Sequence, residues 1–435
     1  MPRRHLWLFL ILCLAVMLRI AHLQTYDPAS VVEIYGGGDS NYYVNVGRTL
    51  VDGTVDYSDA PIAAAPLYLL ISGFIQRFLP ARDSIIALWL FHTLILTLCC
   101  YFMYRLGYRL TDDVRVGLVA AAAFATSVSS IGDTARILTE PIYIFFVLCS
   151  LTLYVDGYLN ENHSILRRRL SLLFVGMLLG FATLTRAVIM LFPAGIVIHM
   201  LMLRRWKDII PFLLAFFFIA GSWTAYTSSY FTWTVFGSDQ FFPALWRGAV
   251  EEDSSPVEND ILRGEESYSE QTVNIITQSP LDYLKLRIRE LSGSYLQPYG
   301  TLGFGSDTLK TRAGAWVNSG FSPSVFMELI RADGFLPRLL IYIWHYVALI
   351  GGLIGMWLTR HRWRLSLPLI GFIAYTTLLH LVVLALPRYI YPTYPVYWIF
   401  ASVTLVAIWD AARNRLHRPA SAASQSVNQQ PAHAE

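Results

Sequence analysis

Five charged residues lie inside or directly beside long uncharged stretches of the sequence, where a charge is costly and calls for an explanation. They are Asp39, Arg136, Glu140, Arg186 and Arg388. A carboxylate can take a proton from a hydroxyl group, and an arginine can bind a phosphate through two parallel hydrogen bonds. Together these residue types suit a site that activates a hydroxyl group and holds a phosphate.

Asp39 follows three glycines within Tyr35–Tyr43, where the backbone can bend close to a ligand. Tyr43, Val46 and Leu50 recur at helical spacing, which predicts an amphipathic helix on the membrane surface with Asp39 at its start. One interpretation makes Asp39 the N-cap of that helix. The other makes it a general base at the boundary between lipid and water.

Each of the other four charges also has a structural and a functional interpretation. Arg136 and Glu140 are four residues apart and could pair at a helix start, or Arg136 could bind a lipid phosphate while Glu140 orients it or a substrate hydroxyl. Arg186 could be a hairpin-tip arginine that reaches the interface, or it could hold an anionic headgroup. Arg388 lies among tyrosines, Tyr391 included, which is typical of an aromatic belt and equally of a substrate-binding rim.

The composition indicates a protein that spans a membrane. Of the 435 residues, 55% are hydrophobic and only 14% are charged, too few to cover a soluble surface. Apolar stretches and arginine clusters predict ten crossings, at residues 6–23, 85–104, 116–131, 140–156, 170–186, 188–203, 209–228, 338–358, 365–386 and 391–411. The predicted fold class is an all-α polytopic bundle of about ten or eleven helices.

Arginine clusters mark the cytoplasmic ends of the crossings. This rule places two long segments, 24–84 and 229–337, on the outer side of the membrane, together with all five of the charges above. The segment 60–79 is apolar enough to cross, but a crossing there would invert everything after it. Either it is re-entrant or a later short hairpin fails to cross fully, and the sequence leaves both alternatives open.

We divide the chain into four parts: an N-terminal transmembrane module at 1–228, an extracytoplasmic loop at 229–337, transmembrane helices at 338–412 and a cytoplasmic, disordered tail at 413–435. The loop contains a predicted amphipathic helix at Tyr283–Leu291, which is typical of a folded, functional loop. The sequence has no basic region with interleaved aromatics, so it does not support nucleic-acid binding. It also has no zinc-ligand spacing, P-loop, nucleophile elbow or dinucleotide fingerprint.

Several short motifs occur in order along the chain. They are Gly38–Tyr43, Gly47–Gly53, Ala65–Leu69, Arg136–Pro141, Gly180–Arg186, Trp246–Gly248 and Pro387–Pro392. As an ordered set they resemble the GT-C superfamily of polyprenyl-phosphate-sugar-dependent glycosyltransferases, particularly bacterial relatives of protein O-mannosyltransferases and lipid A aminoarabinose transferases. One departure is Ser222–Thr227, which stands where relatives often carry Pro-Trp-x-x-Arg-Asn.

The resemblance implies a GT-C fold with two large extracytoplasmic loops, in a bacterial inner or plasma membrane, with an active site that faces outward. It implies hexosyl or pentosyl transfer from a polyprenyl-phosphate-linked sugar to a lipid, glycan or protein acceptor. Asp39 would act as base or sit beside a metal, and Arg136, Arg186 and Arg388 would hold the donor phosphate. Glu140 and Tyr391 are expected to bind substrate.

No residue is assigned as a metal ligand and no cofactor is certain, although the resemblance leaves room for a divalent metal. Two other functions remain open at this point. One is a polymerase or ligase of surface glycans, which could use similar arginines at the membrane rim. The other is a non-catalytic transporter of lipid-linked glycans, which would need charges through the depth of the bundle and a symmetric core.

Overall fold

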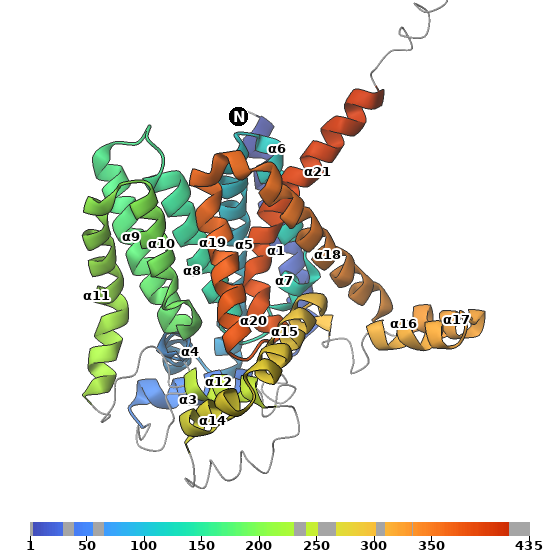
Figure 1. Cartoon of the computed structure of the whole chain (residues 1–435), viewed down its shortest axis with the longest axis horizontal. Coiled ribbons are helices and arrows are strands. Elements are labelled where there is room, and N and C mark those ends of the chain that lie inside the picture. The colour runs from blue at the N-terminus through green and yellow to red at the C-terminus, as the bar shows by residue number, and fades with distance from the viewer. Residues whose placement is uncertain are drawn as a thin grey trace, which may run out of the picture.

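The protein is a helical bundle in the computed structural model, which describes residues 3–28, 39–54, 65–229, 241–250, 267–301, 309–332 and 334–416. Within these ranges every regular element is a helix. The long helices run side by side, and several short helices cover one end of the bundle (Figure 1).

Seven of the described helical segments are long and apolar enough to cross a membrane. They comprise α1 (Arg3–Leu23), α5 (Ala81–Thr111), α8 (Glu140–Thr152) with its π-helical continuation η1 (Leu153–Tyr158), α11 (Ile209–Ser228), α18 (Phe335–Leu358), α19 (Trp363–Val382), and α20 (Pro387–Ile390) continued through η6 (Tyr391–Thr393) into α21 (Tyr394–Leu416). Two further apolar helices are shorter, α6 (Val114–Ala125) and α10 (Phe192–Met202). With α9 (Ile165–Thr185), which begins beside three arginines, a helical segment coincides with each of the ten predicted crossings.

The segment 60–79 forms only one short helix in its described part. This helix, α4 (Pro66–Phe78), has 13 residues and is about 20 Å long, less than the roughly 30 Å of a bilayer core. It packs closely on α3 (Asp39–Asp52), where Gly73 meets the backbone of Gly47. The structure therefore favours the alternative in which this segment does not cross.

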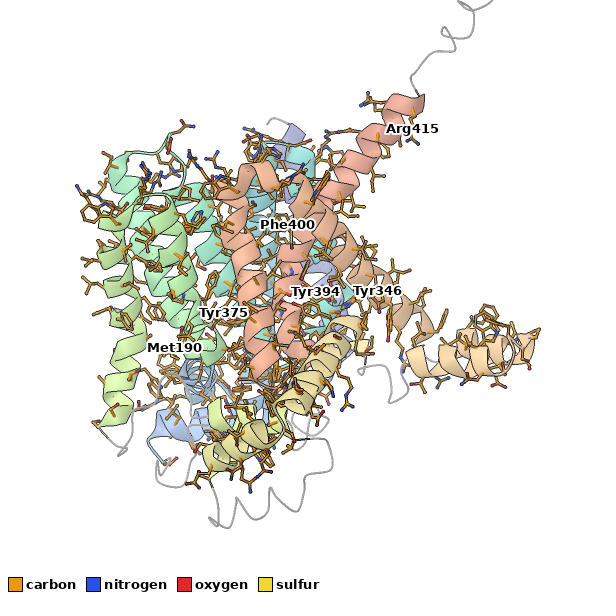
Figure 2. The ribbon with its side chains drawn as sticks, in the orientation of Figure 1. Met190, Tyr346, Tyr375, Tyr394, Phe400 and Arg415 are labelled. Carbon is orange, nitrogen blue, oxygen red and sulfur yellow. The ribbon has the colours of Figure 1, made fainter. Side chains whose placement is uncertain are left out.

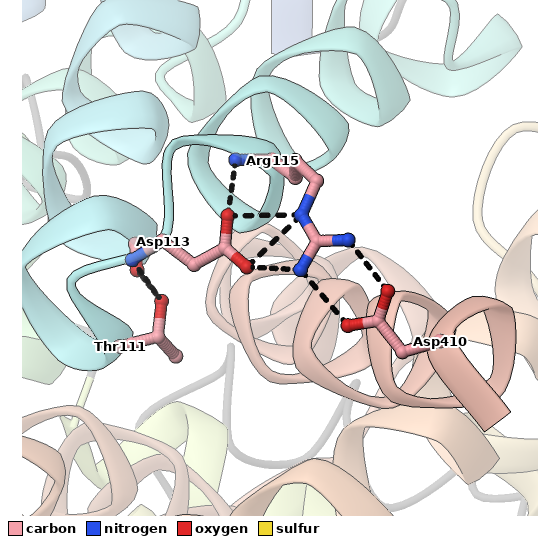
Figure 3. Close-up of polar contacts among 5 residues, drawn as sticks. Thr111, Asp113, Arg115 and Asp410 are labelled. Atoms are coloured by element: carbon pink, nitrogen blue, oxygen red, sulfur yellow. Dashed lines mark hydrogen bonds and ion pairs between the residues drawn. The ribbon is translucent and has the colours of Figure 1, made fainter. Parts of the chain in front are cut away.

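One end of the bundle holds the start of α1, with Arg3 and Arg4, and the last turns of α21, with Arg413 and Arg415 (Figure 2). We call this the arginine-rich end. There Arg115 pairs with Asp113 at 2.7 Å and with Asp410 of α21 at 2.6 Å (Figure 3). Exposed pairs of this kind are screened by water and add little to stability, so their main effect is to align the ends of the helices.

The opposite end of the bundle is covered by α3 and by helices from the large loop (Figure 1). We call it the capped end. The loop helices there are α12 (Phe241–Ala249), α14 (Tyr268–Gln278) and α15 (Pro280–Leu296), while α16 (Leu309–Asn318) and α17 (Pro323–Arg331) lie to the side. The predicted helix at Tyr283–Leu291 is confirmed, because it falls within α15. Trp246 is buried and donates to Gln271 at 3.0 Å, which joins α12 to α14.

Candidate active site

Asp39 is the first residue of α3, at the capped end of the bundle. The predicted amphipathic helix is confirmed, since α3 buries Tyr43 and Val44 against the bundle and leaves its other face open. The ring of Tyr43 lies edge-on to Tyr68, with the ring centres 5.1 Å apart. The three glycines before Asp39 lie outside the described residues. The packing of Tyr43 on Tyr68 fixes the start of α3, and with it the backbone that carries the Asp39 carboxylate.

Glu140 is fully buried at the first position of α8 and is held by two arginines. Its Oε1 atom accepts a hydrogen bond from Nη1 of Arg186 at 2.7 Å and lies 3.2 Å from Nε of Arg388. Arg388 also donates through Nη2 to Oδ2 of Asp39 at 2.5 Å. The structure thus joins Asp39, Arg388, Glu140 and Arg186 in one continuous chain of ion pairs, which we call the charged cluster.

The charged cluster is drawn from four segments that are far apart in the sequence. Asp39 belongs to α3, Glu140 to α8, Arg388 to α20, and Arg186 follows the last turn of α9. The cluster holds two carboxylates and two guanidinium groups, so it is electrically balanced. An added anion would therefore have to compete with a carboxylate for an arginine.

Aromatic side chains hold Arg186 in place, and the two arginines of the cluster differ in exposure. The guanidinium of Arg186 lies 5.7 Å from the ring centre of Tyr143 and 5.2 Å from that of Tyr389, a cation–π geometry. Tyr375 of α19 donates to the carbonyl of Val188 at 2.6 Å and so holds the turn that follows Arg186 (Figure 2). The side chain of Arg186 is only 10% exposed, whereas that of Arg388 is 30% exposed. Arg388 is therefore the more accessible of the two to a ligand.

Arg136 and Tyr391 belong to a second, adjoining group. Arg136 pairs with Asp133 at 3.5 Å, and its guanidinium lies 5.2 Å from the ring centre of Tyr299. The rings of Tyr299 and Tyr391 are 4.6 Å apart at their centres. We call Asp133, Arg136, Tyr299 and Tyr391 the Asp133 group. The structure thus pairs Arg136 with Asp133, while Glu140 takes its partners from α9 and α20.

Asp133 and Tyr299 also lie at the site, although the sequence did not identify them as site residues. Asp133 is 1% exposed, although it lies in a turn between α7 (Val128–Gly132) and α8, where an aspartate is normally hydrated. Burial raises the pKa of Asp133 to about 7; the charge of Arg136 opposes the rise and that of Glu140 adds to it. Burial also holds the pKa of Tyr299 well above its ordinary value, so its hydroxyl remains a hydrogen-bond donor.

The described residues contain no group of three or more His, Cys, Asp or Glu side chains placed to hold a metal ion. The carboxylates near the site are instead engaged with arginines, as described for Asp39 and Glu140. The chemistry that the arrangement offers is a partly exposed carboxylate beside two arginines, next to a buried acid and two tyrosine hydroxyls.

Comparisons with known proteins agree on the kind of protein this chain resembles. Residues 68–235 match the family described as dolichyl-phosphate-mannose-protein mannosyltransferase. The matched range contains Arg136, Glu140 and Arg186, and it excludes Asp39 and Arg388. No curated protein gave a significant match.

Two solved structures are similar over nearly the whole chain. One is the archaeal oligosaccharyltransferase AglB from Archaeoglobus fulgidus in complex with an inhibitory peptide and a dolichol-phosphate, with a TM-score of 0.57 and 13% identity over 100% of this chain and 53% of that one. The other is ArnT from Cupriavidus metallidurans bound to undecaprenyl phosphate, with a TM-score of 0.54 and 15% identity over 92% of this chain and 60% of that one. The chain therefore spans about half to three-fifths of the length of the structures it matches.

Proposed function

The chain has the fold of the GT-C glycosyltransferases, and on this premise we propose that it transfers a hexosyl or pentosyl group from a polyprenyl-phosphate donor to an acceptor hydroxyl. The observation that carries the proposal is the charged cluster, which sets the Asp39 carboxylate 2.5 Å from Arg388 at one end of an apolar bundle. Such a donor needs its phosphate bound where its hydrocarbon tail can remain between helices.

In this proposal Arg388 and Arg186 bind the phosphate of the donor. The phosphate gains negative charge as its bond to the sugar breaks, and guanidinium groups already in place stabilise that charge without reorganisation. Arg136 contributes a third positive charge from the Asp133 group. Glu140 orients the two arginines of the cluster, and Tyr391 binds substrate from the adjoining turn.

Asp39 is proposed as the general base of a single, inverting displacement. It would take the proton from the attacking hydroxyl as the new bond to the sugar forms and the bond to the phosphate breaks. Because Asp39 is paired with Arg388, the arriving phosphate must compete with the carboxylate for that arginine. Binding of the donor would thereby release Asp39 for its role as base.

We place the site on the outer, extracytoplasmic side of a bacterial inner or plasma membrane. The support is the distribution of charge, because arginines concentrate at the end of the bundle opposite to the charged cluster and positive residues favour the cytoplasm. The two outer loops of the sequence prediction then contribute α3 and the helices α12, α14 and α15 to the capped end. The acceptor would be a lipid, glycan or protein that approaches there.

The Asp39 assignment is tested with purified protein and polyprenyl-phosphate sugars, by measuring release of free polyprenyl phosphate. Asp39→Asn should abolish transfer and yet tighten the binding of undecaprenyl phosphate severalfold, because the competitor for Arg388 is gone. Asp52→Asn is the matched control, since Asp52 is an exposed acid of the same helix paired with Arg48 at 3.7 Å. Unchanged transfer by Asp39→Asn would remove Asp39 from the mechanism.

The same assay separates the other functions. A glycan polymerase or ligase that uses diphosphate-linked donors would release polyprenyl diphosphate instead of the monophosphate. A non-catalytic transporter would release neither product. Transporters also usually carry charged residues through the depth of the bundle, whereas the charged cluster lies at one end.

A further inference from the structure

Five buried polar atoms beside the charged cluster have no hydrogen-bond partner among the described residues. They are both carboxylate oxygens of Asp133, of which Oδ1 has only the long ion pair with Arg136 at 3.5 Å, the hydroxyl oxygen of Thr134, and the hydroxyl oxygens of Tyr299 and Tyr391. The two tyrosine hydroxyls lie near enough to Asp133 to lower its pKa, although neither completes a hydrogen bond with it. Buried polar groups are almost always paired, so a concentration of unpaired ones at one place indicates a polar ligand.

Contacts from neighbouring elements hold the residues that carry these atoms in place. Ser129 of α7 donates to the carbonyl of Tyr299 at 2.8 Å, which fastens the large loop to the turn that carries Asp133. The next residue, Gly300, has a φ of 95°, a backbone conformation that residues with side chains rarely adopt. The buried Arg19 of α1 donates to Ser130 at 2.8 Å and holds α7 from the other side. The unpaired atoms therefore belong to a rigid, preorganised arrangement.

The chemistry of the group suits a neutral ligand rich in hydroxyl groups. Asp133 offers two acceptor oxygens, while Thr134 and the two tyrosines each offer a hydroxyl that can donate or accept. The ring of Tyr299 is in contact with Arg136 and Tyr391, and its hydroxyl has no hydrogen-bond partner among the described residues and is offered to a ligand. What the group adds beyond Arg136 is hydroxyl groups and the Asp133 carboxylate, which would repel a second phosphate.

The group also lies next to the proposed phosphate site. Tyr391 is three residues beyond Arg388, and the charge of Glu140 reaches both Asp133 and Tyr299. We propose that Asp133, Thr134, Tyr299 and Tyr391 form a subsite that hydrogen-bonds the hydroxyl groups of the sugar carried by the donor, beside the arginines that hold its phosphate. This inference rests on the proposed function and adds to it the residues that recognise the sugar.

The experiment compares two probes on the full-length protein in detergent: undecaprenyl phosphate, and undecaprenyl phosphate carrying mannose or the best-bound member of a panel of hexoses and pentoses. Tyr299→Phe removes one hydroxyl and keeps the ring, and Asp133→Asn keeps the shape of the side chain. Each should weaken binding of the sugar-bearing probe by about tenfold and leave undecaprenyl phosphate within about twofold. The matched control is Tyr346→Phe, whose hydroxyl donates to the exposed carbonyl of Leu296 at 2.9 Å.

The alternative outcomes are distinct. Equal weakening of both probes, or no change in either, would overturn the subsite and leave the group a structural one. An unchanged donor affinity with a raised KM for the acceptor would move the subsite to hydroxyl groups of the acceptor and overturn the donor assignment. If the wild-type protein fails to bind undecaprenyl phosphate at all, the proposed function itself fails, and the subsite fails with it.

Discussion

Replacing Glu140 by glutamine removes the only carboxylate shared by the two arginines of the charged cluster, among the contacts described for it. Glu140 is 0% exposed, lies 2.7 Å from Arg186 and 3.2 Å from Arg388. Glutamine keeps the size of the side chain but not its charge. Arg388 would retain Asp39, whereas Arg186 would lose its carboxylate partner within a buried site.

The expected cost follows from the burial of that pair. A pair of unit charges about 4 Å apart attract by about 4 kcal/mol at the effective dielectric of such sites, and desolvation offsets part of this. Removing one partner from a buried pair typically costs about 3–5 kcal/mol, because the other charge is left uncompensated. We therefore expect Glu140→Gln to lower the free energy of unfolding by about that amount.

The assay is thermal unfolding in detergent, with and without undecaprenyl phosphate. A phosphate can replace the missing negative charge, so the ligand should raise the unfolding midpoint more in Glu140→Gln than in the wild type. Glu161→Gln is the matched control: Glu161 also pairs with an arginine, Arg205 at 3.1 Å, but it is 75% exposed at the arginine-rich end. Its replacement should cost less than about 1 kcal/mol.

Two results would refute this reasoning. The first is a Glu140→Gln protein that unfolds at the wild-type temperature, which would mean that the buried pairs contribute nothing. The second is a variant that is destabilised but gains no additional stabilisation from undecaprenyl phosphate. In that case Glu140 would be structural only, and Arg186 would not be a phosphate ligand.

Three further predictions address the donor, the scaffold and the pH dependence. Arg388→Lys should weaken binding of undecaprenyl phosphate and leave acceptor affinity unchanged, because lysine cannot form a bidentate contact with phosphate. A change confined to acceptor affinity, measured by steady-state kinetics, would contradict the phosphate role. Gly73→Ala should destabilise the protein by about 1–3 kcal/mol and lower transfer, because a methyl group there overlaps the carbonyl of Gly47 and pushes α3 away. The control is Gly371→Ala, where an added methyl group has no neighbouring atom within 4 Å; this variant should be as stable and as active as the wild type. The affinity for the sugar-bearing probe, whose phosphodiester charge does not change near neutral pH, should rise with pH through about 7, since burial raises the pKa of Asp133 to about 7 and its charged form accepts hydrogen bonds more strongly; a titration showing the same rise in Asp133→Asn would assign it to another group.

The sequence predicted the helical segments and all four residues of the charged cluster, because the same physical rule applies in both cases. An apolar stretch of sufficient length specifies a helix in a membrane, and a charge inside or beside it is costly enough to stand out. Asp39, Glu140, Arg186 and Arg388 were identified by that cost. Their mutual distances could not be predicted, because they depend on the packing of four helices that are distant in the chain.

The pairing of Arg136 illustrates what the sequence could not reveal. Its spacing of four from Glu140 is the spacing of neighbours on a helix face, but α8 begins only at Glu140. Arg136 lies in the turn before that helix, so the helical spacing does not apply, and it pairs with Asp133 three residues earlier. Asp133 itself was overlooked because an aspartate in a turn is ordinary in a sequence, and only the fold shows that this one is buried.

In the proposed mechanism, the two groups of the site divide the recognition of the sugar-phosphate donor between them. The charged cluster is balanced, so it attracts an anion only by exchanging one of its own ion pairs, and Arg388 is the more exposed of its two arginines. The Asp133 group adds a buried acid and two tyrosine hydroxyls beside Arg136, and these groups suit the hydroxyl groups of a ligand. A sugar phosphate carries both a phosphate and hydroxyl groups, and so offers each of the two groups the partner proposed for it. In this proposal the pairing of Asp39 with Arg388 links recognition to chemistry, because the donor that fills the site would also separate this pair.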